Sequence, residues 1–211
     1  MKDSYRFDGH IAGVGTTSGV RLVVGHWHGT PYGAFSDVMV EMPDGHRVLV
    51  APREAVAAFV ASTYAFDEVR IEPVSVECGT EWSVHTRSLQ LRFTSCSRLW
   101  VAPLLRLVPP PVRRTATWAR MCNPIASRLM PGVQTYGSAG GGRDEWYEAR
   151  DVRRLVAARA TWEGAELGAL APVEPPVRFG FASAPARPTL TTLTSWVRTP
   201  SGTAAPSRDE T

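Results

Sequence analysis

Residues 31–64, PYGAFSDVMVEMPDGHRVLVAPREAVAAFVASTY, constrain the fold most, because two strands, a turn and a helix can be assigned there. Side chains at residues 37–42 alternate in a period of two, which predicts a half-buried strand. Proline, aspartate and glycine at 43–45 predict a tight turn, since proline fixes φ and glycine accepts a positive φ. Residues 46–50 then form the partner strand.

A helix is expected to follow this hairpin. Pro52 suits a first helical turn, and Glu54 lies near the positive end of the helix dipole. Apolar residues at helical spacing would pack on the hairpin, namely Val56, Phe59, Val60 and Tyr64. Similar patterns elsewhere give about eight to ten strands and two helical regions. Residues 1–19 are glycine-rich and predict a short lead-in with one strand, and further strands are expected at residues 152–162 and 177–181. Pro124 is expected to break the helical region at residues 113–130. The fold class is therefore α+β, mainly an antiparallel curled sheet or barrel.

The chain is long enough for a substantial core. With 211 residues, 44% of them apolar, we expect one domain over residues 1–198. Residues 199–211 consist mainly of Ser, Thr, Pro, Gly and Arg, which predicts a disordered tail.

Several features indicate a cytoplasmic protein. No apolar run approaches the ~18 residues that cross a bilayer, and the N-terminal residues lack a hydrophobic signal region. The three cysteines are widely spaced and form no CxxC pair, which argues against a disulfide framework or a cysteine zinc site. No cofactor is predicted.

The basic residues are unevenly distributed. Lys2 is the only lysine. The folded part of the chain beyond it therefore has no lysine amine that could form a Schiff base. Residues 82–142 contain eight arginines and no acid, which suggests a weak contact with an anionic surface. The alternative is a solvated basic face balanced by acids elsewhere in the fold. Nucleic acid is not expected, because aromatics and arginines do not interleave in an RNA-binding pattern.

Known catalytic and metal motifs are weak. His26 and His28 share one face of a strand end, and His46 on a neighbouring strand could complete a metal site. The spacing departs from the usual His-x-His pattern because the first glutamate after it is Glu41. We therefore predict no metal. The sequence also lacks a GxSxG elbow and a phosphate-binding GK[ST] loop.

Two stretches resemble the acetoacetate decarboxylase-like superfamily. One is the strand–turn–strand–helix pattern of residues 32–64. The other is residues 152–170, VRRLVAARATWEGAELGAL, in which residues 160–164 resemble a tryptophan-containing turn of that family. The resemblance implies a curled antiparallel sheet or barrel around an apolar pocket for a small organic acid or ketone.

One departure from the family changes the chemistry. The family's decarboxylase uses a lysine of lowered pKa, which forms a Schiff base with the substrate. By order along the chain, that lysine would fall near residues 52–64, which contain none. Amine-dependent decarboxylation is therefore excluded.

We predict a small-molecule-binding protein with a pocket for an apolar or carboxylate-bearing ligand. An arginine would pair with a carboxylate, a glutamate would accept a proton, and aromatics would line the walls. The candidate ligand-binding residues are Tyr32, Glu41, His46, Arg159, Trp162 and Glu163. Two alternatives stay open: a lysine-independent lyase using Glu and His as acid and base, and a non-enzymatic module that binds a partner or a membrane surface through residues 82–142. A homo-oligomer also stays open.

Overall fold

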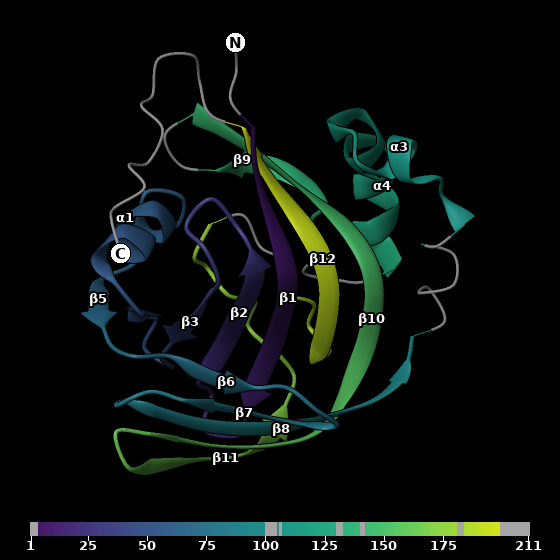
Figure 1. Cartoon of the computed structure of the whole chain (residues 1–211). Coiled ribbons are helices and arrows are strands. Elements are labelled where there is room, and N and C mark those ends of the chain that lie inside the picture. Colours follow the sequence, from purple (N-terminus) through teal and green to yellow (C-terminus); the bar gives the residue numbers. More distant parts are fainter. Residues whose placement is uncertain are drawn as a thin grey trace.

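The computed structural model describes residues 4–99, 105, 107–129, 133–139, 142–180 and 184–198, and most of them lie in strands (Figure 1). The strands are β1 (Ser4–Thr16), β2 (Arg21–Gly29), β3 (Phe35–Glu41), β4 (Arg47–Ala51), β5 (Glu68–Ile71), β6 (Ser75–Glu77), β7 (Glu81–His85), β8 (Leu89–Arg98), β9 (Tyr136–Ala139), β10 (Arg143–Trp162), β11 (Ala165–Ala171) and β12 (Thr189–Arg198). The helices are α1 (Glu54–Ala61), α3 (Pro110–Arg113) and α4 (Ala116–Leu129).

All twelve strands belong to one sheet, in the order β5-β4-β3-β2-β1-β11-β10-β8-β7-β6. Strand β12 pairs with both β1 and β10, and β9 pairs with β10. Only the β4–β5 pair is parallel among the described pairings. The two strands that end this order, β5 and β6, follow one another directly in the chain. The sheet therefore curls until its two edges approach each other (Figure 1).

Strand β1 is central to the sheet, although the sequence indicated only a glycine-rich lead-in with one strand. It pairs with β12 over residues 4–13 and with β2 over residues 8–15. Its glycines permit close packing. A Cβ at Gly9 would overlap the carbonyl oxygen of His26, and one at Gly15 would overlap that of Pro172. The glycines that suggested a loop thus let other backbone segments approach the strand.

Both faces of the first half of the sheet are covered. One face forms the main core inside the curl, where valines of β1–β4 meet Trp82, Leu91 and Phe93. The other face is covered by α1 and by residues 172–180. Because successive side chains of a strand point to opposite faces, each strand contributes to both cores.

The predicted hairpin and helix are confirmed. Strands β3 and β4 pair in antiparallel register, Gly45 has a φ of 92°, and α1 buries Val56 and Val60. Strand β3 differs from the prediction in one respect: its polar face is also covered, and Asp37 is only 2% exposed.

The second half shows three further differences. Strand β10 begins at Arg143, well before the predicted start at residue 152, because charged residues hide its alternation. Helix α4 continues through Pro124, where a break was predicted. Pro124 and Arg120 are exposed, so water can solvate the carbonyl that lacks its helical donor. A strand was predicted over residues 177–181, of which the described residues 177–180 form an irregular cover over the sheet.

The predicted class, α+β with a mainly antiparallel curled sheet, is confirmed at this level. Residues 199–211, the predicted tail, lie outside the described residues. Among the described helices, none has the length and apolar character that crossing a bilayer would require.

Candidate functional site

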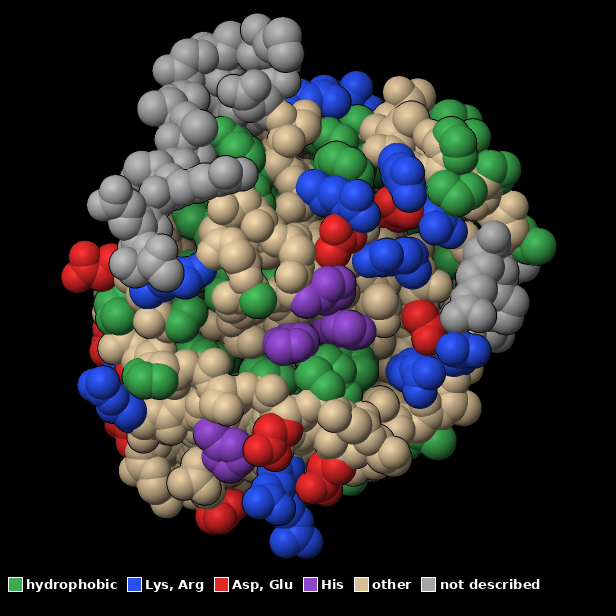
Figure 2. Space-filling model, viewed as in Figure 1, with side chains coloured by type: hydrophobic (Ala, Val, Ile, Leu, Met, Phe, Trp, Pro, Cys, Tyr) green, Lys and Arg blue, Asp and Glu red, His purple; other side chains and the backbone are tan. Residues whose placement is uncertain are grey.

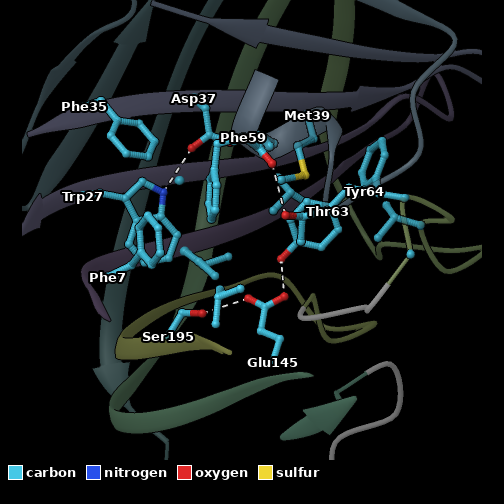
Figure 3. A pocket seen from close by; sticks show the side chains of 18 residues that line it. Phe7, Trp27, Phe35, Asp37, Met39, Phe59, Thr63, Tyr64, Glu145 and Ser195 are labelled. Atoms are coloured by element: carbon cyan, nitrogen blue, oxygen red, sulfur yellow. Dashed lines mark hydrogen bonds between the residues drawn. The ribbon is translucent and has the colours of Figure 1, made fainter. Parts of the chain in front are cut away.

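The candidate site is a cavity of about 60 Å³ between β1–β3, α1 and residues 177–180, which we call the Asp37 cavity (Figure 3). Each water molecule needs about 10–15 Å³ of such space, so the cavity has room for about four to six. Its lining is mostly apolar: Phe7, Ile11, Val23, Gly25, Trp27, Phe35, Asp37, Met39, Phe59, Val60, Thr63, Tyr64, Glu145, Val177, Phe179, Gly180, Ser195 and Val197.

Asp37 is the buried acid on the β3 side. Its carboxyl oxygen accepts a hydrogen bond of 3.0 Å from Nε1 of Trp27. Burial raises the pKa of Asp37 to about 7, and the hydrogen bond from Trp27 opposes this shift only in part. Near neutral pH, a large fraction of Asp37 therefore carries a proton and can act as a hydrogen-bond donor.

Glu145 is the buried acid on the β10 side, and it is 3% exposed. Ser195 and Tyr64 donate hydrogen bonds of 2.8 and 2.9 Å to its two carboxyl oxygens. Burial raises the pKa of Glu145, while hydrogen bonds from Ser195, Tyr64 and Tyr147 act in the opposite direction. Figure 3 shows Asp37 and Glu145 at opposite ends of the cavity. A bound molecule would therefore meet one carboxyl group at each end.

The strand register explains why Asp37 and Trp27 lie close together. Asp37 pairs with Gly25 across β2 and β3, and Trp27 lies two residues further along the same face. A Cβ at Gly25 would overlap the carboxyl of Asp37 and lie 2.6 Å from Nε1 of Trp27. The glycine thus creates the space for the Asp37–Trp27 hydrogen bond. Glu145 and Ser195 come from the neighbouring strands β10 and β12.

None of the six predicted ligand-binding residues lines the Asp37 cavity. Glu41 is fully buried, where Nη2 of Arg21 lies 3.1 Å from its carboxylate. The backbone N–H and Nε of Arg178 also donate to Glu41, at 2.6 and 3.0 Å. Glu41 therefore anchors the segment that covers the cavity, without contacting the cavity itself.

His46, Trp162 and Glu163 are linked through a surface network. His46 lies 3.2 Å from Glu68, which is paired at 2.5 Å with Arg70. Arg70 is also 2.5 Å from Glu163, and its guanidinium lies 5.0 Å from the ring centre of Trp162. His46 and Glu163 are exposed, whereas Trp162 belongs to the main core. The network provides charge pairing at the sheet edge.

Tyr32 and Arg159 lie apart from this network in the contacts described. The ring of Tyr32 packs 5.1 Å from that of Phe59, which lines the cavity. Burial raises the pKa of Tyr32 to about 12. Arg159 lies on β10 with an exposed side chain. Tyr32 is thus the predicted residue with the nearest connection to the cavity.

A histidine cluster joins two of the three predicted metal candidates. His26 and His28 gather with His10, whose ring centre is 6.3 Å from that of His26 and 6.2 Å from that of His28. Figure 2 shows a group of histidine side chains on the visible face of the molecule. Burial, with the neighbouring His26 and His28, lowers the pKa of His10 to about 4. His46 instead contacts Glu68. Among the described residues, no three His, Cys, Asp or Glu side chains are arranged to hold a metal.

Acids from outside the acid-free segment balance several of its arginines. Arg98 pairs with Asp151 at 2.9 Å, and Arg113 pairs with the buried Glu148 at 2.6 Å. Arg114 lies 3.7 Å from the same carboxylate. The balancing acids, Glu148 and Asp151, lie on β10 and follow the segment directly in the chain.

The sequence interpretation missed both cavity acids. Asp37 was assigned to the polar side of a half-buried strand, and Glu145 lay before the predicted start of its strand at residue 152. One signal was available for Asp37, since it is a charged residue between apolar neighbours Phe35 and Met39 on the same strand face. Nothing local marks Glu145, because its partners Tyr64 and Ser195 are distant in sequence.

Comparisons with known proteins give little further information. No family model matches the chain, and no curated protein matches it. Among solved structures, a protein from Nitrosomonas europaea provisionally named AttH is similar at 8% identity, with a TM-score of 0.28. The match covers 96% of this chain and 52% of that protein, so the chain spans about half its length. At this TM-score the similarity supports no assignment of function.

Proposed function

We propose that the protein binds a small, neutral, mainly apolar organic molecule in the Asp37 cavity and transfers protons to and from it. The observation that carries the proposal is the pair of buried carboxyl groups at opposite ends of one apolar cavity. Burial raises the pKa of both. Perturbed acids in an apolar cavity are a common property of acid–base sites.

The lining favours a neutral ligand over a carboxylate. None of the lining residues is Arg, Lys or His, so a bound carboxylate would find no cation in the cavity. The oxygen of a carbonyl compound would instead accept a hydrogen bond or a proton from neutral Asp37. The resemblance to the acetoacetate decarboxylase-like superfamily, with its pocket for a small acid or ketone, supports the same ligand size without Schiff-base chemistry.

The different surroundings of the two acids suggest different roles. Glu145 receives hydrogen bonds from two hydroxyl groups, which stabilise its carboxylate form and suit a base. Asp37 receives a hydrogen bond from Trp27 alone among the described side chains, so burial dominates and keeps a large fraction of Asp37 protonated near neutral pH, as suits an acid. We infer that Asp37 protonates the ligand while Glu145 removes a proton from the opposite end. This is the chemistry of an acid–base isomerase or lyase.

The experiment measures binding and proton transfer separately. A panel of small ketones, unsaturated ketones and alkenes is screened by thermal shift, and each binder is then incubated in D2O. The wild type should introduce deuterium at carbon, as observed by proton NMR. Asp37→Asn and Glu145→Gln keep the side-chain shapes, so both variants should still bind the ligand. Their rate of deuterium exchange should fall by roughly 100-fold or more.

Glu163→Gln provides the matched control, because this glutamate is exposed and lies outside the cavity. It should exchange as the wild type does. Binding without exchange in the wild type would overturn the catalytic half of the proposal. The absence of any binder, or unchanged exchange in both cavity variants, would overturn the assignment of the site.

A further inference from the structure

We propose that the outward face of α3 and α4 docks on an anionic lipid bilayer. This face carries an unusual concentration of exposed apolar side chains. Seven large apolar residues are exposed among the described residues, and four of them lie on these helices or just before α3: Leu107 (77%), Val112 (43%), Met121 (67%) and Ile125 (61%). Figure 2 shows hydrophobic side chains beside Lys and Arg side chains over these helices. Such an exposed patch indicates an interaction surface.

Helix α4 presents apolar and basic residues to solvent together. Met121 and Ile125 are one turn apart and therefore share a face. Arg128 is exposed and lies close to Met121 in helical projection. Arg120 is exposed at the edge of this face, where its guanidinium lies 4.3 Å from the ring centre of Tyr136. Arginines beside exposed apolar residues are typical of helices that lie in a membrane interface.

The local charge favours an anionic surface. The segment contains no Asp or Glu from residue 82 to residue 143. Asp144 accepts a hydrogen bond from Tyr136, which contacts Arg120. Glu148 is buried and paired with Arg113 and Arg114. Its charge is thus neutralised inside the protein. The outward face presents net positive charge, which anionic lipid headgroups would complement.

A second cavity lies beneath this face. It measures about 180 Å³ and is lined mainly by apolar groups, including Val108, Trp118, Cys122 and Ile125. Ile125 both lines this cavity and is 61% exposed, so the cavity reaches the outward face. An acyl chain of a lipid fits such an apolar space better than the charged side chains of an acidic polypeptide. We therefore assign the face to a bilayer.

The test is flotation of the full chain with lipid vesicles. Phosphatidylcholine vesicles are compared with vesicles that contain about one third phosphatidylglycerol, at low and at physiological salt. The protein should float with the anionic vesicles and not with the neutral ones, and binding should weaken as salt rises. Each arginine near an anionic surface contributes about fivefold to partitioning, so Arg120→Gln with Arg128→Gln should weaken binding roughly thirtyfold.

The apolar contribution needs separate variants. Met121→Ser with Ile125→Ser should also abolish flotation, since both side chains would enter the interface. Matched controls remove an exposed valine and an exposed arginine from the sheet, Val156→Ser and Arg159→Gln. These should bind vesicles as the wild type does. Circular dichroism and thermal melts establish that all variants are folded.

Three results would overturn the proposal. The first is equal flotation with neutral and anionic vesicles, and the second is unchanged binding in both helix variants. The third is self-association, measured by sedimentation velocity without lipid, that disappears in the Met121/Ile125 variant. That result would assign the face to a second copy of the chain. None of these outcomes depends on ligand binding in the Asp37 cavity.

Discussion

Replacement of Asp37 by asparagine should stabilise the protein above neutral pH. The folded-state pKa of about 7 lies above the ordinary aspartate value of 3.8, because the charged carboxylate is costly in the apolar cavity. Because the folded-state pKa is raised, the contribution of protonated Asp37 to stability is fully present below about pH 4. This contribution is then lost as the pH rises through 7. Asparagine resembles the protonated acid in shape, stays neutral and can still accept the hydrogen bond from Trp27.

The size of the effect follows from the shift in pKa. A difference of about three units corresponds to roughly 4 kcal/mol, at 1.36 kcal/mol per unit. Asp37→Asn should therefore be more stable than the wild type by up to ~4 kcal/mol at pH 8 and by less than ~1 kcal/mol at pH 4. All other titrating groups are shared by the two proteins, so they cancel in the difference unless they are coupled to Asp37.

The assay is urea unfolding of both proteins from pH 4 to 8.5, followed by tryptophan fluorescence and circular dichroism. Glu166→Gln, which removes an exposed carboxyl group, provides a control and should change stability little at any pH. A difference between Asp37→Asn and the wild type that does not grow with pH would refute the reasoning. So would a variant that is less stable at pH 8.

Three further predictions concern other parts of the fold. Arg21→Ala should lower the free energy of unfolding by about 3–5 kcal/mol in urea, because it removes a partner from the buried Glu41 carboxylate. Gly25→Ala should cost about 1–3 kcal/mol and weaken ligand binding, because the new methyl overlaps the carboxyl of Asp37. The Cys122 thiol should react more slowly with a thiol reagent at pH 8 than the two exposed thiols, because its partial burial limits access to the reagent.

Matched controls accompany these three predictions. Arg47→Ala breaks a more exposed ion pair with Asp67 and should cost less than ~1 kcal/mol. Gly29→Ala introduces a methyl whose nearest neighbour is 3.5 Å away, so it should be tolerated. If Arg47→Ala lowered the free energy of unfolding as much as Arg21→Ala, or Gly29→Ala as much as Gly25→Ala, the structural reasons given would be contradicted. Equal reaction rates for all three cysteines would contradict the position of Cys122.

The local architecture of residues 35–61 could be predicted because its signals are local. Alternation identifies β3, Gly45 identifies the turn, and apolar spacing identifies the buried side of α1. The same alternation misassigned Asp37, since a period of two separates the faces of a strand but does not show whether both are covered. Residues 177–180, distant in sequence, provide part of that cover.

The surroundings of the predicted site residues also depend on contacts between distant segments. Glu41 was placed in a ligand site, but its partners Arg21 and Arg178 lie in separate segments of the chain. His46 and Glu163 are connected only through Arg70 and Glu68, which no sequence spacing reveals. Glycines in β1 suggested a loop because their role depends on neighbouring backbone. Contacts between distant segments therefore decide which polar residues are structural and which face a cavity.

The assignment of the Asp37 cavity as the ligand site is tested most directly by methyl NMR. A small ketone or alkene identified by thermal shift is titrated into protein with ¹³C-labelled methyl groups. Changes in chemical shift should concentrate at the lining residues Ile11, Val23, Val60 and Val177, while Leu91 in the main core changes little. Shifts that concentrate instead on α3 and α4, or that spread evenly over the protein, would contradict the assignment.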